Sequence, residues 1–320
     1  MRIVTVALIA LAGAACAGVA RPQVQNAPPP AGVSMWVEPT DIASRDLYYG
    51  PWGQEHAPDP NDVYDLVELK HSGVNLGMTV KDSKGREWSV KQPFPGNLDS
   101  EAPVEVVVSR LLSAVGYRQP PVYFLGSFTL KDDFGSKTTV GGRFRPKLEE
   151  LDEEDEWDWA NNPFVGTREY QGLIVALVMF NSTDLKNSNN SLYEHKDGDL
   201  VEQWYVARDV GSALGDTQRM APRKNHIESF ERMPFILGVK PNGFVEFAYN
   251  GWYQNLIEDR IKPEDVAWIS NLFARLSDKQ MQDAFRAAGY DPDIASRFIA
   301  KLREKIQQGR SLRLAATARP

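Results

Sequence analysis

The hydrophobic pattern changes its period along the chain, and this change limits the folds that the sequence can adopt. Three apolar stretches of strand length come first, at Val67–Lys70, Met78–Val80 and Trp88–Lys91. The pair Lys84-Gly85 indicates a hairpin turn between the last two. Apolar residues then recur at helical spacing from Val104 to Val115, and Gly116 ends the helix. We therefore expect a small sheet followed by one buried helix.

The remaining pattern predicts a second, mostly helical part. Two further strands are expected at Val122–Phe128 and Thr138–Phe144, before an apolar helix at Tyr170–Phe180. The later elements are a strand pair at Leu192–Glu194 and Trp204–Arg208 and three helices, Pro263–Leu276, Lys279–Ala288 and Pro292–Gln308. This order predicts an α+β fold of two lobes, a β-rich N-lobe over residues 65–147 and a helical C-lobe over 148–312, with a tail at 313–320.

The N-terminus has the pattern of an export signal. Residues 1–20 carry one positive charge at Arg2, an apolar run and then small residues, which predicts a secretory signal peptide. Cys16, the one cysteine of the chain, ends a sequence that resembles a bacterial lipobox, so a lipid anchor there and ordinary cleavage after Ala17 or Ala20 both remain open. We expect an exported protein of the periplasm or cell envelope. Residues 21–64 then form a tether and an irregular extension.

Several functions are excluded by composition and by missing motifs. A net charge of -7 argues against nucleic-acid binding through phosphate neutralisation. The chain has neither a G-x-S-x-G elbow nor an H-E-x-x-H motif, and its four histidines lack metal-ligand spacing. The acidic run at residues 149–158 predicts a solvated surface segment.

One set of polar residues has the spacing that phosphoryl transfer requires. Asp184 follows the apolar helix, Asn189 lies five residues later, and Asp209 stands two residues before Gly211 at the end of a predicted strand. In this chemistry one carboxylate accepts the proton of the attacking hydroxyl, while an amide oxygen and a second carboxylate bind a divalent metal. Asn187 and Asn190 compete with Asn189 as the metal ligand.

These residues resemble the protein-kinase-like superfamily, in particular the HipA-like and CotH-like groups of atypical bacterial kinases. Lys91 resembles the strand lysine that contacts nucleotide phosphates, and Glu105 the helix carboxylate that pairs with it. The resemblance implies a two-lobed kinase-like fold, Asp184 as the base, and Asn189 with Asp209 as metal ligands. Gly73 and Gly77 are the candidates for a phosphate-covering loop. Two departures are Ser182-Thr183 in place of the usual His-Arg, and Val210 in place of Phe.

The sequence thus predicts an exported atypical kinase or phosphotransferase that uses ATP, or another nucleotide, with Mg²⁺ or Mn²⁺. Its acceptor, a protein or a small molecule, is not defined. The alternative is a catalytically inactive, kinase-like binding or scaffold lipoprotein, for which Trp157 and Trp159 in the acidic run would supply a contact surface. A metal-dependent hydrolase is a third hypothesis. The basic residues Arg143, Arg145 and Lys147 either contact phosphate or are ordinary charged residues on a strand and its exit loop.

Overall fold

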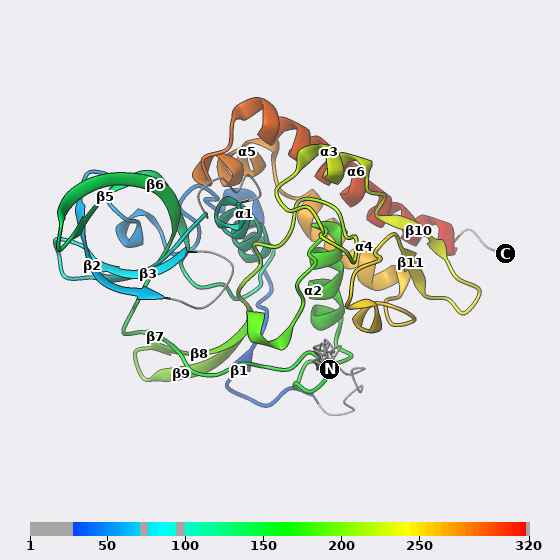
Figure 1. Ribbon diagram of the computed structural model, residues 1–320. Helices are drawn as coiled ribbons and strands as arrows, with labels where there is room; N and C mark the ends of the chain where they lie inside the picture. Colours follow the sequence, from blue (N-terminus) through cyan, green and yellow to red (C-terminus); the bar gives the residue numbers. More distant parts are fainter. Residues whose placement is uncertain (1–27, 71–75, 94–99, 318–320) are drawn as a thin grey trace, which may run out of the picture.

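The computed structural model describes residues 28–70, 76–93 and 100–317, without the side chains of 313–317 (Figure 1). The predicted signal peptide with Cys16, part of the tether, and Gly73 lie outside the described residues. Figure 1 shows a β-barrel on one side of the molecule and a group of helices on the other. The predicted α+β arrangement of two lobes is confirmed by these two parts.

Five strands form the barrel. They are β2 (Val63–Lys70), β3 (Leu76–Lys81), β4 (Glu87–Gln92), β5 (Tyr123–Asp132) and β6 (Gly135–Pro146). The order around the barrel is β2-β3-β4-β6-β5, and a parallel pairing of β2 with β5 closes it. Trp88, Phe128 and Phe144 are among the buried residues of its interior. The turn predicted at Lys84-Gly85 joins β3 to β4, with Gly85 at φ +84°.

The alternation of side chains along β4 decides which residues face out of the barrel. Trp88 and Val90 belong to the barrel interior, so Ser89 and Lys91 point outward. In the pairing of β4 with β6, Lys91 lies opposite Arg143 and Ser89 opposite Arg145. Three cationic side chains therefore share one outer face, an arrangement that needs neighbouring carboxylates.

Helix α1 (Glu101–Ala114) supplies those carboxylates. It packs against β5 and β6 on one side and against α5 (Asp278–Ala287) on another. Its valines are poor helix formers, but burial on nearly all sides compensates for that. Glu101 and Glu105 are four residues apart and so lie on the same face of the helix.

A second sheet lies beside the barrel, in the order β1-β9-β8-β7. Its strands are β1 (Val33–Ser34), β7 (Leu151–Glu153), β8 (Asn190–Asp197) and β9 (Leu200–Ala207). Through β1 the N-terminal extension joins this sheet. The indoles of Trp36 and Trp52 also donate to the carbonyls of Val115 and Gln119, so aromatic side chains fix the extension near the end of α1.

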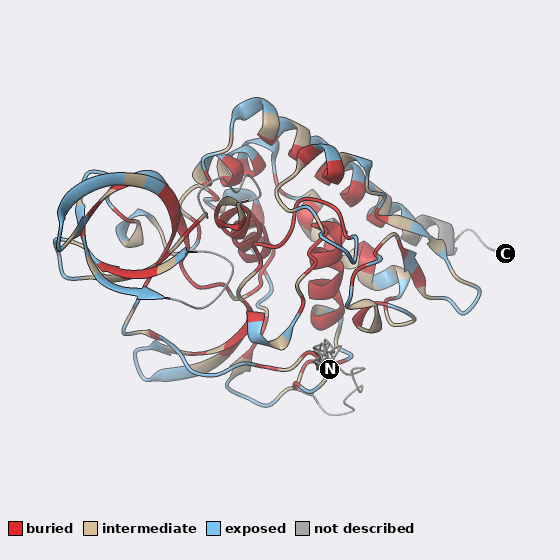
Figure 2. Cartoon of the chain, in the orientation of Figure 1, coloured by how far each residue is buried: buried red, intermediate tan, exposed pale blue. Residues whose placement is uncertain are grey.

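The helical part is built on α2 (Arg168–Met179), which is buried along most of its length (Figure 2). Around it lie α3 (Ile227–Arg232), α4 (Pro263–Ala274) and α6 (Pro292–Thr317), and short 3₁₀ turns occur at Ile42–Ser44, Gln54–His56, Asn187–Asn189 and Gln254–Leu256. α4 packs on both α2 and α6.

The sequence predicts only helices after the strand that ends at Arg208, and this prediction misses one element. Strands β10 (Ile236–Val239) and β11 (Val245–Phe247) form an antiparallel hairpin there. Asn242-Gly243 makes its turn with Gly243 at φ +87°, and Asn-Gly is a strong hairpin signal. Within the described residues, no helix is long and apolar enough to cross a bilayer.

Candidate active site: a lysine shared by three carboxylates

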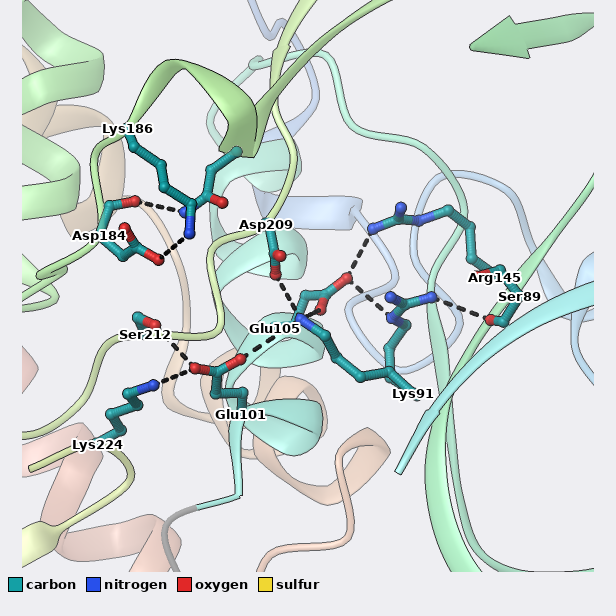
Figure 3. A network of polar contacts seen from close by, with 12 residues as sticks. Ser89, Lys91, Glu101, Glu105, Arg145, Asp184, Lys186, Asp209, Ser212 and Lys224 are labelled. Carbon is teal, nitrogen blue, oxygen red and sulfur yellow. Dashed lines mark hydrogen bonds and ion pairs between the residues drawn. The ribbon is translucent and has the colours of Figure 1, made fainter. Parts of the chain in front are cut away.

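Lys91 lies at the centre of the site (Figure 3). Its Nζ is 2.7 Å from Oδ1 of Asp209, 3.4 Å from Oε2 of Glu101 and 3.5 Å from Oε2 of Glu105. The side chain is 16% exposed. Burial alone lowers the pKa of Lys91, but Glu105 and Asp209 outweigh burial and hold that pKa above its ordinary value. Lys91 is therefore a charged ammonium fixed between the barrel, α1 and the segment that follows β9.

Glu105 is 1% exposed and contacts three cationic side chains on the outer face of the barrel. Besides Lys91, its Oε1 accepts a hydrogen bond of 2.7 Å from Arg145 and lies 2.9 Å from Nε of Arg143. Nη1 of Arg143 also donates to the carbonyl of Ser89 at 3.0 Å. The sequence pairs Glu105 with Lys91 alone, whereas the structure divides this carboxylate among three cations.

Of the three basic residues, Arg143 and Arg145 fit neither hypothesis, whereas Lys147 is an ordinary charged residue on the exit loop of β6. Arg143 and Arg145 are buried against Glu105, where they hold α1 on the barrel. Lys147 instead pairs with Glu87 at 2.7 Å on the surface. The first two are neither ordinary surface charges nor free to bind phosphate without loosening Glu105.

Asp209 is held by both its backbone and its carboxylate. Its N–H donates to the carbonyl of Asn189 at 3.0 Å. Burial alone raises the pKa of Asp209, but the Lys91 ammonium outweighs it and lowers that pKa to about 2. Val210 enters the main hydrophobic core. Gly211 lies so close to Glu101 that a Cβ would come within 2.8 Å of that residue's carbonyl oxygen, which explains the glycine.

Glu101 is a site residue that the sequence reasoning missed. Its carboxylate contacts Lys91, accepts a hydrogen bond of 2.9 Å from Ser212, and pairs with Lys224. Burial alone raises the pKa of Glu101, but Lys91 and Lys224 outweigh it and lower that pKa. The signal that could have found it is its spacing, because Glu101 lies one helical turn before Glu105.

Asn189 connects Asp184 to Asp209. Its Nδ2 donates to the backbone carbonyl of Asp184 at 2.6 Å, and its own carbonyl accepts from the N–H of Asp209. The carboxylate of Asp184 pairs with Lys186 at 3.0 Å and stays partly exposed. Because Asn189 donates through its nitrogen, its amide oxygen is the atom suited to a cation.

The other two asparagines have structural contacts. Oδ1 of Asn187 accepts from the N–H of Trp159, and Nδ2 of the buried Asn190 donates to the carbonyl of Trp157. Both tryptophans are inside the protein, 3% and 1% exposed. The hypothesis that Trp157 and Trp159 form a contact surface is therefore wrong. Their indoles pack against each other in the core, with ring centroids 4.6 Å apart, while the acidic side chains around them stay exposed.

The Ser182-Thr183 departure also has a structural explanation. The N–H and hydroxyl of Thr183 both donate to the carbonyl of Ser212, at 2.9 and 3.2 Å. Ser212 in turn donates to Glu101. The start of the Asp184 loop is thereby joined to the Asp209–Ser212 segment and, through it, to α1.

Of the two glycines proposed for a phosphate-covering loop, Gly77 is described by the structure and Gly73 is not. Gly77 lies on β3 directly opposite Lys91. Gly73 belongs to residues 71–75, outside the described residues.

The side chains of Asn189 and Asp209 are suited to a divalent metal that is also bound by the phosphates of a nucleotide. Among the described residues no group of three or more His, Cys, Asp or Glu has the geometry of a metal site. The ionised Asp209 carboxylate and the Asn189 amide oxygen are hard oxygen donors, and Mg²⁺ commonly takes one or two protein ligands together with substrate phosphates and water. The donor set therefore fits Mg²⁺ or Mn²⁺ delivered with a nucleotide.

Comparison with known proteins found no matching family model and no matching curated protein. The chain aligns with several solved kinases, at low identity and low TM-score. A Helicobacter pylori proinflammatory kinase, CtkA, aligns over 78% of this chain and 99% of its own, with 11% identity and a TM-score of 0.36. The Rio2 kinase complex with ADP/Mg²⁺ and phosphoaspartate from Chaetomium thermophilum covers 77% and 72%, with 14% identity and a TM-score of 0.34.

A Golgi casein kinase aligns over 82% of this chain and 73% of its own, at 8% identity and a TM-score of 0.34.

Proposed function

We propose that the protein is an atypical kinase or phosphotransferase, which transfers a phosphoryl group from a nucleotide such as ATP to a hydroxyl acceptor. One observation carries this proposal. Asn189 joins the Asp184 loop to Asp209 by two hydrogen bonds, and Asp209 lies 2.7 Å from Lys91, which also contacts a buried helix carboxylate. The cation, the proton acceptor and the metal donors that phosphoryl transfer needs are thereby linked in one cluster.

Each side chain has a separate task in this proposal. Lys91 binds the phosphates of the nucleotide, and Glu101 and Glu105 hold its ammonium in place. Asp209 and Asn189 hold the divalent metal, which neutralises phosphate charge when it is bound. Asp184 orients the acceptor hydroxyl and takes its proton while the bond from the transferred phosphorus to the leaving nucleotide oxygen breaks.

The ion pair of Lys91 with Asp209 has to open before a nucleotide binds. The Lys91 ammonium would then contact phosphate, and the Asp209 carboxylate would be free to hold the metal. The remaining contacts of Lys91, to Glu101 and Glu105, keep the ammonium from leaving the site during this exchange.

We further propose that this activity belongs to the periplasm or cell envelope. The leader pattern of residues 1–20 supports export, and Cys16 is the candidate for a lipid anchor. Since ATP is scarce outside the cytoplasm, the exported form requires imported nucleotide, another phosphate donor, or action before export is complete.

The test is turnover of a labelled nucleotide. Purified protein with ATP and Mg²⁺ or Mn²⁺ should release ADP and transfer phosphate to itself or to an envelope fraction. Asp184→Asn should lower the rate by about 10²- to 10⁴-fold, the usual contribution of a positioned base. Asp152→Asn, in the exposed acidic run, is the matched control and should retain full activity.

A protein that binds no nucleotide and turns over none would contradict the proposal. That result would favour the kinase-like binding or scaffold protein without catalysis. Hydrolysis that releases phosphate to water, and that does not depend on a nucleotide, would favour a metal-dependent hydrolase.

A further inference from the structure

A cavity of about 630 Å³ lies away from the Lys91 cluster. Its walls come from the N-terminal extension, the C-terminal end of α1 and the β8–β9 pair, and they include Arg45, Leu47, Trp52, Arg110, His195 and Trp204. None of Lys91, Glu105, Asp184, Asn189 or Asp209 lines it. A volume of this size accommodates a small organic molecule.

Arg110 in this cavity wall is a buried cation with unused donors. Its side chain extends from α1 and is 2% exposed. Nε and Nη2 make no hydrogen bond, and within the described part of the chain no carboxylate forms an ion pair with it. Burial lowers the pKa of Arg110 to about 10, so the guanidinium stays charged at neutral pH.

Asp46, which also lines the cavity, attracts the Arg110 guanidinium through its charge but forms no ion pair with it. Its Cζ lies 5.1 Å from the centroid of the Tyr123 ring. Gly50, at φ +77°, approaches so closely that a Cβ there would meet Nη1 at 2.4 Å. A buried, unpaired guanidinium is costly, and a ligand oxyanion that pairs with its fork of N–H groups removes that cost.

The other arginines of the cavity are already paired. Arg45 bonds to Asp41 and to the carbonyl of Ser113, and Arg118 bonds to Glu202. Burial, with Arg118 nearby, lowers the pKa of His195, whose ring stacks on Trp204 with centroids 4.2 Å apart. Among the three arginines of the wall, Arg110 is thus the one with free donors, and the Trp52 ring belongs to the same wall.

We propose that this cavity binds a small molecule that carries a carboxylate or phosphate group on an aromatic or aliphatic body. The anionic group pairs with Arg110, and the body packs against Trp52. Arg110 also lines a second cavity, of about 580 Å³, where Arg110 and Lys84 face Glu55 and Asp59, so its wall has no net charge. The wall of the first cavity has Arg45, Arg110 and Arg118 against Asp41 and Asp46, so its net positive charge favours an anion. The proposal is independent of the phosphotransferase activity.

The test compares three probes of similar shape, namely benzoate, phenyl phosphate and the uncharged benzamide, in a thermal-shift titration at constant ionic strength. Benzoate or phenyl phosphate should raise Tm, by about 3 °C at a tenfold excess over its Kd, and benzamide should not. Whichever of the two raises Tm more identifies the anionic group. Arg110→Met should abolish the shift. Lys91→Met should retain it, which separates this cavity from a phosphate site at Lys91.

If Arg110→Met does not fold, hydrogen exchange of the wild-type protein with and without the probe provides a second test. The active probe should protect amides in residues 47–52 and in the C-terminal half of α1. The proposal is overturned if no anionic probe binds, if benzamide binds equally well, or if protection is confined to β4 and residues 209–212.

Discussion

Nζ of Lys91 lies 2.7 Å from Oδ1 of Asp209, although 118 residues separate the two in the chain. One comes from the barrel and the other from the segment after β9, so this ion pair connects the two parts of the molecule at the site. Around it, Lys91, Arg143, Arg145 and Lys224 face Glu101, Glu105 and Asp209. The cluster therefore carries one net positive charge, which favours a phosphate ligand.

Replacing Glu105 should destabilise the protein strongly. Glu105→Gln leaves Arg143, Arg145 and Lys91 without their shared, fully buried carboxylate, and removal of one member of such a buried group costs about 3 kcal/mol. Urea unfolding of both proteins measures the difference. The control is Glu87→Gln, which breaks only the surface pairs with Lys81 and Lys147 and should change the free energy of unfolding little. Equal effects of the two substitutions would contradict the network described for α1.

Acid should weaken the protein partly through Asp209. Its pKa falls from 3.8 to about 2 on folding, so the folded state binds this proton more weakly than the unfolded state. The stability that results is present above about pH 4 and is lost as the pH falls towards 2. The free energy of unfolding of Asp209→Asn should therefore fall less steeply over this window than that of the wild type. Parallel curves would show that Lys91 does not shift the titration of Asp209.

Two of the three asparagines of the 187–190 loop, Asn189 and Asn190, should behave in opposite ways. Asn189→Ala removes the proposed metal oxygen and the bond to Asp184, so nucleotide turnover should fall by at least about tenfold, in line with loss of a metal-orienting group. Asn190→Ala removes the buried bond to the Trp157 carbonyl and should lower the free energy of unfolding by about 1–3 kcal/mol. In the folded Asn190→Ala protein the metal dependence should be unchanged. A loss of metal dependence in Asn190→Ala, with none in Asn189→Ala, would reverse the assignment.

The order of the elements could be predicted because strong local signals mark it. The Lys84-Gly85 turn, the helical spacing from Val104 to Val115 and the apolar run of α2 each correspond to an element of the structure. Lys91 and Glu105 could be paired because they stand at a strand end and on the next helix. What local patterns could not give is how the carboxylates are shared, since Arg143 and Lys224 reach them only through tertiary contacts.

Local sequence patterns also did not show which side chains are buried. Trp157 and Trp159 stand among acidic residues, which predicts a surface, but alternate side chains point in opposite directions and the indoles pack inward. The β10–β11 hairpin was missed because its strands are short and lie between helices. Its Asn242-Gly243 turn was nevertheless a usable signal.

Export predicts that the protein isolated from the cells that produce it lacks its signal peptide. The missing segment would be residues 1–15, 1–17 or 1–20. The intact mass should correspond to a chain that begins at Cys16 with added lipid, or at Gly18 or Arg21 without it. Cys16→Ala should remove the lipid mass and release the protein from the membrane fraction if the cysteine is the anchor. A cytoplasmic protein that retains Met1 would contradict export.

The central claim, a nucleotide site organised by Lys91 and Asp209, is tested most directly by a thermal-shift titration with ATP and Mg²⁺ or Mn²⁺. The wild type should gain about 2.7 kcal/mol of apparent stability at a hundredfold excess of nucleotide over its Kd, and only when metal is present. Asp209→Ala should lose this gain while remaining folded. No shift in the wild type with any nucleotide and metal, or an undiminished shift in Asp209→Ala, would contradict the account.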